Sequence, residues 1–302
     1  MQTVLVRKNL AILLVFGLFM ALALGAFACG SSTVSTTTTG APTSTSRATA
    51  TTATTVASTT TVPPAGDDGT QALTVSAASS LKAAFTEIGK AFDSANSSKT
   101  TFNFDASGTL QKQIEGGAPV DVFASAAPKQ VNALVGEKLA DASTVKTFAG
   151  NEIVLVVPAN STLDVTSFQD LTKAAVKKIT YGDPKVAPHG VAAEEILNKI
   201  GVYSEAKPKV IYAGNVAQAV QYVSSGEVDA GILFKTEALT AGDKVKIVAT
   251  ADQSWYTAIA YPIVVVSDGK NKTLGQAFID YVAGPDGQAT LKKYGFLPAP
   301  VQ

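Results

Sequence analysis

The sequence has little of the chemistry on which most enzymes and metalloproteins depend. Its 302 residues include one cysteine, one histidine and one tryptophan. A lone cysteine cannot close an internal disulfide, and a lone histidine excludes zinc sites built from several histidines. The 24 Lys and Arg residues balance the 24 Asp and Glu residues, so no basic excess indicates a nucleic-acid partner.

Motifs for nucleotide binding and catalysis are also missing. The chain has no G-x-G-x-x-G, Walker or G-x-S-x-G sequence. Residues 79–82 read SSLK and match the S-x-x-K pattern of serine acyl-transferases, but no K-T-G or S-D-N follows. Only His189 could complete a Ser-His-Asp triad. A serine acyl-hydrolase therefore stays a remote alternative, and we expect no catalytic residue.

The first residues have the layout of a secretory signal. Arg7 and Lys8 precede an apolar run over 10–24, and the small residues Ala26 and Ala28 follow it. This order of charged, apolar and small residues is typical of a signal peptide rather than a membrane span. Residues 1–28 are predicted to direct export and to be removed.

The only cysteine, Cys29, stands directly behind this signal, in a setting that resembles the lipobox of bacterial lipoproteins. We expect lipid attachment there and anchoring to the cell membrane, with a free cysteine in a discarded signal as the alternative. Residues 29–70 are predicted to be a tether. Within it, 31–66 contain 21 Ser or Thr among 36 positions, a composition that cannot bury enough apolar surface to offset the entropy of ordering.

From residue 71 onward, short β-branched or aromatic runs alternate with amphipathic segments. This alternation indicates an α/β fold with mostly parallel strands. Strands are predicted over 73–78, 100–106, 121–125, 152–158, 177–184, 209–214 and 229–234. Helices are predicted over 80–92, 110–114, 129–137, 170–176, 191–200, 216–223, 273–282 and 286–294.

The folded part is longer than a typical single domain. Two wholly apolar strands, over 153–157 and 263–266, bracket a long block, and we interpret them as crossings between two lobes. The first lobe is predicted to comprise residues 71–150 and 261–302, and the second to comprise residues 151–260. A cleft between lobes is a natural ligand position. Trp255 and Tyr256 are expected to pack at the return crossing, with a role in capping the cleft as the alternative.

Four strand-to-helix junctions are rich in small, hydroxyl, amide and glycine residues. They read AASSL, DASGT, APHGV and AGNVA, over 77–81, 105–109, 187–191 and 213–217. A serine or asparagine before one helix is usually only an N-cap. Four such junctions around one cleft would instead supply N–H and O–H donors for an anion with no need for a cation. A site of donors alone fits a fully deprotonated tetrahedral oxyanion, and we expect the one nearby carboxylate, Asp105, to point away.

The junctions and the segments around them together resemble the molybdate-binding proteins of bacterial ABC importers. The matching stretches are AASSL (77–81), SGTLQKQIEGGAPVDVFASA (107–126), GDPKVAPHG (182–190), GNVAQAV (214–220), GEVDAGILFKTEA (226–238) and KKYGFLP (292–298). The resemblance covers about residues 72–298. It implies the two-lobed type II periplasmic-binding-protein fold, with the ligand between the lobes.

In that family, two serines and backbone N–H groups coordinate the oxyanion. The resemblance assigns the serine roles to Ser107 and to Ser80, with Ser79 as the alternative to Ser80, and the backbone roles to His189 and Val216. Family members commonly have a small residue where this chain has His189, so the imidazole must either point away or join the rim of the site.

A second departure is Phe234, which stands where the family usually has a tyrosine that donates its hydroxyl to the ligand. One missing donor in a closed cleft costs about 1–3 kcal/mol, or roughly ten- to a hundredfold in affinity. A water, the His189 ring or Tyr261 could take its place. The change also leaves room for tungstate or sulfate.

The sequence therefore predicts an extracytoplasmic binding lipoprotein that captures molybdate or tungstate and delivers it to the permease of an ABC importer. We expect a monomer without enzymatic activity, cofactor, cation site or nucleic-acid partner. A receptor for another tetrahedral oxyanion, such as sulfate, is the alternative in the same class. A surface-interaction protein with a degenerate cleft is an alternative from a different class.

Overall fold

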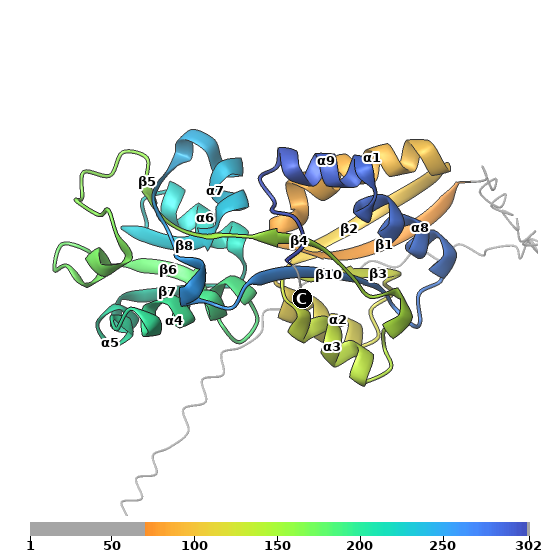
Figure 1. The fold of residues 1–302 in the computed structure, drawn as a ribbon, viewed down its shortest axis with the longest axis horizontal. Helices are drawn as coiled ribbons and strands as arrows, with labels where there is room; N and C mark the ends of the chain where they lie inside the picture. Colours follow the sequence, from red (N-terminus) through yellow and green to blue (C-terminus); the bar gives the residue numbers. More distant parts are fainter. Residues whose placement is uncertain (1–69, 301–302) are drawn as a thin grey trace, which may run out of the picture. The chain divides into compact units, whose positions relative to one another are not determined.

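The computed structural model describes residues 70–300 (Figure 1). The predicted signal peptide, the predicted lipid attachment at Cys29 and nearly all of the predicted tether lie outside the described residues. Within 70–300, no helix is long and apolar enough to cross a membrane. Two five-stranded sheets, each covered by helices, organise this part of the chain.

We call the first sheet, with its helices, the first lobe. Its strands lie in the order β2 (Ser98–Asp105), β1 (Gln71–Ala78), β3 (Val122–Ala124), β10 (Ile259–Val265) and β4 (Lys146–Asn151). Strand β1 pairs in parallel with β2 and β3, whereas β10 runs antiparallel to β3 and β4. The lobe contains the helices α1 (Lys82–Asn96), α2 (Ser107–Glu115), α3 (Pro128–Gly136), α8 (Lys272–Ala283) and α9 (Pro285–Lys293).

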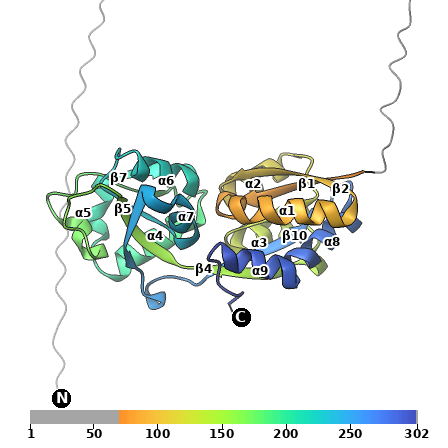
Figure 2. The same ribbon diagram turned by 90° about the horizontal axis from the view of Figure 1, so that it is seen from above.

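Helices α1, α8 and α9 cover one face of this sheet, and α2 and α3 cover the other (Figure 2). In α1, Phe85, Ile88 and Phe92 share one face because they are spaced by three and four residues. Phe85 and Phe92 both pack edge-on against Phe278 of α8, with ring centroids 5.8 Å and 5.2 Å away. This aromatic cluster holds the helical layer against the sheet.

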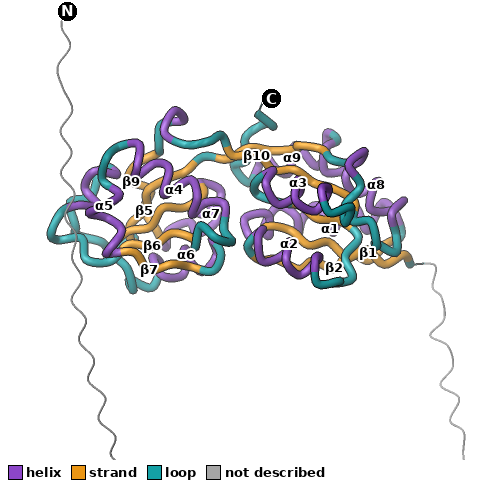
Figure 3. Tube along the Cα trace, turned by 90° about the horizontal axis from the view of Figure 1, so that it is seen from below, coloured by secondary structure: helices purple, strands orange, loops and turns teal. Residues whose placement is uncertain are grey.

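The second sheet, with its helices, is the second lobe (Figure 3). Its strands lie in the order β7 (Val210–Ala213), β6 (Ile179–Gly182), β8 (Ala230–Phe234), β5 (Ile153–Pro158) and β9 (Val245–Thr250). Strand β6 pairs in parallel with β7 and β8, and β5 runs antiparallel to β8 and β9. One face carries α4 (Pro188–Lys199) and α5 (Tyr203–Ala206), and the other carries α6 (Val216–Ser224) and α7 (Lys235–Ala241).

Short 3-10 helices complete the described part. They are η1 (Ser79–Leu81), η2 (Ala142–Thr144), η3 (Phe168–Thr172), η4 (Lys207–Lys209), η5 (Gly242–Lys244) and η6 (Gln253–Trp255). The predicted α/β class with mostly parallel strands is confirmed, because each sheet has a single strand antiparallel to both of its neighbours, β10 in one and β5 in the other.

The chain passes between the sheets at Glu152 and returns between β9 and β10. Strands β5 and β10 each pair within one sheet, so they flank the crossings. The interpretation of the two apolar strands as the crossings themselves is therefore wrong. Tyr256 lies at the return crossing, where its hydroxyl accepts a hydrogen bond from the Ile153 N–H at 3.3 Å. Trp255 packs edge-on against Phe168, with ring centroids 6.1 Å apart. The predicted packing role of both aromatics is confirmed.

The helix predicted over 170–176 is wrong. The segment is the one-turn 3-10 helix η3, followed by turns. Ser167 and Asp170 form a capping box that starts it, and the ammonium of Lys209 donates to the carbonyls of residues 171, 172 and 173. A cation from a distant segment therefore takes the carbonyls that a longer helix would have used internally.

Candidate functional site

A small cavity of about 10 Å³ lies where the two lobes meet, at the starts of helical segments from both of them. Its walls are formed by Ala78, Ser79, Ser80, Asp105, Ala106, Ser107, Ala126, Ala187, Pro188, His189, Asn215, Val216 and Phe234. The structure thus brings together all five residues predicted to bind an oxyanion. This volume holds about one water-sized body, so in this arrangement of the lobes it excludes a sugar, peptide or nucleotide.

The first lobe contributes two buried hydroxyls. Ser107 is the first residue of α2, and its Oγ accepts a hydrogen bond from the Ala126 N–H at 3.0 Å. Ser80 lies in η1, and its Oγ is 2.9 Å from the hydroxyl of Tyr261. Ser79 lines this cavity and also a second hollow, which it shares with Lys82 and Glu237.

The second lobe contributes backbone N–H groups at two helix starts. His189 is the second residue of α4, and because Pro188 has no N–H, its amide is the first donor of that helix. Val216 is the first residue of α6, where Asn215 caps the helix by accepting from the Gln218 N–H at 3.1 Å. The cap leaves the Val216 N–H without an acceptor inside the helix. The positive ends of both helix dipoles therefore face the cavity.

The imidazole of His189 is buried between α4 and β6. A Cβ placed on Gly182 would lie 2.4 Å from its Cε1 atom, so the ring occupies the space that a side chain at 182 would need. Helix α4 also approaches the end of β6 closely at Gly190, where an added Cβ would be 2.0 Å from the Gly182 carbonyl oxygen. Burial lowers the pKa of His189 to about 3, so the ring is neutral at physiological pH, and its Nε2 has no hydrogen-bond partner among the described residues.

Phe234, the last residue of β8, closes the cavity with an apolar ring. Its centroid lies 5.5 Å from that of His189 and 6.0 Å from that of Tyr261. The hydroxyl that a tyrosine would carry at this position is therefore absent, as the sequence predicts. Tyr261, a predicted substitute, does not line the cavity but reaches it through Ser80.

The expectation that Asp105 points away is wrong, because the residue lines the cavity. Its Oδ1 accepts from the Ala106 N–H at 2.7 Å and from the Asn215 Nδ2 at 2.9 Å. Asn215 belongs to the second lobe, so the carboxylate is turned inward by a bond that joins the two lobes. The sequence could not indicate this bond, because the partners are 110 residues apart.

A backbone contact also joins the lobes at the rim. The Gly108 N–H donates to the Val186 carbonyl at 2.8 Å, and a Cβ on Gly108 would lie 2.8 Å from both Val186 Cα and its carbonyl oxygen. Only a glycine lets the two main chains approach this closely. The lobes are therefore closed on the cavity in this structure.

The same surroundings argue against acyl transfer at Ser80. Its hydroxyl bonds to Tyr261, whose pKa is raised by burial, and a protonated phenol is a poor base. The serine of the S-x-x-K sequence is the neighbouring Ser79, which lies with Lys82 beside the second hollow. Within 70–300, no three His, Cys, Asp or Glu side chains gather in a way that could hold a metal cation.

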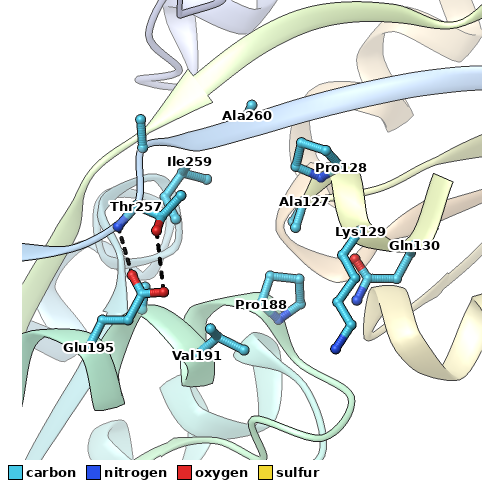
Figure 4. Close-up of a pocket in the computed structure, with 13 residues that line it drawn as sticks. Ala127, Pro128, Lys129, Gln130, Pro188, Val191, Glu195, Thr257, Ile259 and Ala260 are labelled. Carbon is cyan, nitrogen blue, oxygen red and sulfur yellow. Dashed lines mark hydrogen bonds between the residues drawn. The ribbon is translucent and has the colours of Figure 1, made fainter. Parts of the chain in front are cut away.

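A larger cavity of about 320 Å³ lies beside this site and shares Ala126 and Pro188 with it. Figure 4 shows its mainly apolar walls, which include Val191 and Ile259. Its carboxylate, Glu195, already accepts from the N–H of Thr257 at 2.6 Å and from the hydroxyl of the same residue at 3.3 Å. Its other polar side chains include Lys129 and Gln130 of α3.

Comparison with known proteins gives a consistent picture. A family model described as bacterial extracellular solute-binding protein matches residues 73–297. YvgL of Bacillus subtilis (strain 168), named as an ABC transporter substrate-binding lipoprotein, is 38% identical over 225 residues, covering 74% of this chain and 85% of that protein. The molybdate-binding protein ModA of Escherichia coli (strain K12) is 35% identical over 230 residues, covering 74% and 88%.

A solved structure shares the fold as well. It is described as the substrate binding domain of a molybdenum ABC transporter from Clostridium difficile, with 34% identity and a TM-score of 0.61. The match covers 76% of this chain and 100% of that one. The resemblance stated from the junction motifs is confirmed by these similarities.

Proposed function

The chain belongs to the bacterial extracellular solute-binding proteins, and from this premise we propose that it captures molybdate or tungstate and delivers it to an ABC importer. The relatives and the solved structure that are named for molybdate or molybdenum support this ligand. No step of this function requires bond making or breaking by the protein.

One observation carries the proposal: hydroxyl and amide donors from both lobes surround a single small cavity. Ser80 and Ser107 come from the first lobe, and the N–H groups of His189 and Val216 come from the second. A fully deprotonated tetrahedral oxyanion has only acceptor oxygens, so a shell of donors matches it. The helix dipoles favour its double negative charge with no lysine or arginine in the wall.

We further propose that the protein is tethered outside the cell membrane through a lipid on Cys29. The position of this cysteine behind an export signal supports the anchor, and so does the similarity to a protein named as a lipoprotein. A permease in the same membrane is the proposed partner. A single protein molecule per captured ion is the proposed working unit.

Thermal unfolding with a panel of molybdate, tungstate, sulfate and phosphate tests the ligand. A ligand that binds only the native state raises the melting temperature in proportion to the logarithm of its concentration. Molybdate and tungstate should raise it most and by similar amounts, and sulfate should raise it less because the smaller ion reaches fewer donors at once. A larger shift with sulfate than with molybdate would favour the sulfate-receptor alternative. No shift with any of the four would reject the proposed function.

A further inference from the structure

Among residues 70–300, Tyr261 is the one residue outside the cavity wall that hydrogen-bonds to the Ser80 hydroxyl. Its side chain is fully buried on β10, and its hydroxyl is 2.9 Å from Ser80 Oγ and accepts from Asn151 Nδ2 at 3.0 Å. Asn151 ends β4, directly before the crossing to the second lobe. The contact therefore links the crossing to the site.

The side-chain amide of Asn151 fixes the directions of the hydrogen bonds that join Asn151, Tyr261 and Ser80. The Asn151 Oδ1 accepts from the Glu152 N–H at 2.9 Å, which fixes the amide so that its NH₂ group faces Tyr261. The NH₂ group also donates to Thr236 Oγ1 at 2.9 Å, so both of its hydrogens are used. Asn151 is thus a donor toward Tyr261 and cannot accept from it there.

The hydroxyl proton of Tyr261 then has one available acceptor, which is Ser80 Oγ. The Tyr261 oxygen already accepts from Asn151, and the remaining partner of this buried hydroxyl is Ser80 Oγ. Donation to Ser80 avoids leaving a buried hydroxyl proton unpaired. Burial also raises the pKa of Tyr261, so the proton stays on the phenol. Ser80 accepts from Tyr261, and its own proton is left to point into the cavity.

Ser107 is held in the same way by a different donor. Its Oγ accepts from the Ala126 N–H, so its proton is likewise left for the cavity. The hydroxyls of Ser80 and Ser107 can therefore donate to a ligand but are poorly placed to accept from one. The one carboxylate in the wall, Asp105, already accepts two hydrogen bonds at Oδ1.

We propose that Tyr261 is a positioning residue that makes Ser80 an obligate hydrogen-bond donor and so selects fully deprotonated oxyanions over those that carry a proton, such as hydrogen phosphate. This inference rests on the proposed function, because it concerns the same site. Tyr261 acts here through Ser80, without touching the ligand. The tyrosine hydroxyl missing at position 234 is not replaced at that position, but Tyr261, whose ring packs against Phe234, sets the polarity of a ligand serine.

Replacing Tyr261 by Phe tests the inference. The ring can keep its packing on Phe148, Phe234 and Phe296, while Ser80 Oγ loses its donor and becomes free to accept. The Kd for molybdate should rise by about tenfold, because the ordered donor is lost. The ratio of the phosphate Kd to the molybdate Kd, from displacement titrations at neutral pH, should fall at least roughly fivefold. Sulfate, which carries no proton, should weaken together with molybdate.

Tyr256→Phe is the matched control. It removes a buried hydroxyl five positions away that bonds to Ile153 and Gln253 and does not line the cavity. Its phosphate-to-molybdate ratio should equal that of the unmodified protein. In a Ser80→Ala background, Tyr261→Phe should change the molybdate Kd by less than about twofold, because the two hydroxyls act as one unit.

An unchanged ratio in Tyr261→Phe, the same fall in Tyr256→Phe, or an undiminished effect in the Ser80→Ala background would overturn the inference. If Tyr261→Phe does not fold, Asn151→Asp replaces it: the new carboxylate accepts from Tyr261, turns the tyrosine proton away from Ser80 and should lower the ratio as well. An unchanged ratio in that variant would also overturn it. An unmodified protein that binds no molybdate would instead reject the proposed function itself.

Discussion

The two lobes are built alike but bring different donors to the cavity. Each has a five-stranded sheet in which the fourth strand of the order, β10 or β5, runs antiparallel to its neighbours. The first lobe faces the cavity with the hydroxyls of Ser80 and Ser107, and the second faces it with the helix starts at His189 and Val216. One scaffold can therefore present side-chain donors in one copy and main-chain donors in the other.

The lobes also differ in their buried titratable groups. The second lobe holds His189, whose pKa is lowered to about 3 by burial, and Glu237, whose pKa is raised to about 7 by burial against the opposing effect of Lys82. In the wall of the first lobe, Asp105 is tied by two hydrogen bonds. The shifted pKa values of His189 and Glu237 should make the stability of the second lobe depend on pH.

The largest effect is expected from Gly108→Ala, which pushes the lobes apart at the rim. The new Cβ would meet the Val186 main chain at 2.8 Å, and main-chain atoms cannot rotate away. Closure should cost about 3 kcal/mol, which corresponds to roughly a 150-fold rise in the molybdate Kd measured by calorimetry. Gly136→Ala is the control, because no atom lies within 4 Å of its added Cβ. Equal affinity in both variants would contradict the closed geometry.

Removing a donor of the first lobe should have the next largest effect. Ser107→Ala deletes a hydroxyl that is fully buried at the cavity, so the molybdate Kd should rise by roughly 30-fold, or about 2 kcal/mol. Ser76→Ala is matched to it, because Ser76 is a buried serine of the same lobe whose Oγ has no partner among the described residues. The control should bind as the unmodified protein does. Calorimetry showing no loss in Ser107→Ala would remove this serine from the site.

Adding a side-chain donor to the second lobe would reduce the contrast between the lobes. Phe234→Tyr places a hydroxyl on the ring that closes the cavity, and a gain of about 1 kcal/mol, or roughly fivefold in molybdate affinity, is expected. Phe234→Leu, which shortens the side chain without a donor, should show no gain. A loss in Phe234→Tyr would mean that the cavity has no room for the added oxygen.

The smallest net effect is expected on the way the free energy of unfolding depends on pH. His189 has a folded pKa below its ordinary 6.5, so its contribution to stability is present above pH 6.5 and is lost as pH falls from 6.5 toward 3, by about 2 kcal/mol at pH 5. Glu237 has a folded pKa above its ordinary 4.5, so its contribution is present below pH 4.5 and is lost as pH rises through 7. Between pH 4.5 and 6.5 the two groups therefore change the free energy of unfolding in opposite directions.

Urea unfolding at several pH values separates them. His189→Ala should gain stability relative to the unmodified protein as pH falls from 6.5, and Glu237→Gln should gain relative stability as pH rises toward 7. The slope with pH is the quantity to compare, because both changes also alter packing. Parallel pH profiles for the three proteins would contradict the burial of these two groups.

The fold was predictable where the pattern is local. Helices that bury a regular apolar stripe, such as α1 with Phe85 and Phe92, are visible from spacing alone. The short helices α5 and α7 were not predicted. Strands β4 and β9 were not predicted, and both are edge strands with mixed composition. The helix over 170–176 failed because Lys209, far along the chain, takes its carbonyls.

The site was predictable in the same measure. The junction motifs locate the four segments, because small and polar residues before helices are a local signal. The resemblance to the molybdate-binding proteins then assigns the roles within them to Ser80, Ser107, His189 and Val216, all of which line the cavity. The bonds that orient these groups join residues far apart in sequence, such as Ser80 with Tyr261 and Asp105 with Asn215, and no local pattern indicates them. The sequence shows a glycine at position 108 but not why one is needed there, because the Val186 main chain that leaves no room for a Cβ lies in the other lobe.

The contact between α4 and β6 has a consequence for how this site can change over evolutionary time. Gly182 and Gly190 let the helix start directly against the strand end, so the His189 amide is fixed by the sheet itself. Nearly any side chain at 189 that fits the space would keep that N–H; proline alone would abolish it. Variation in the second lobe can therefore alter the walls of the cavity while its anion-holding groups are inherited with the architecture.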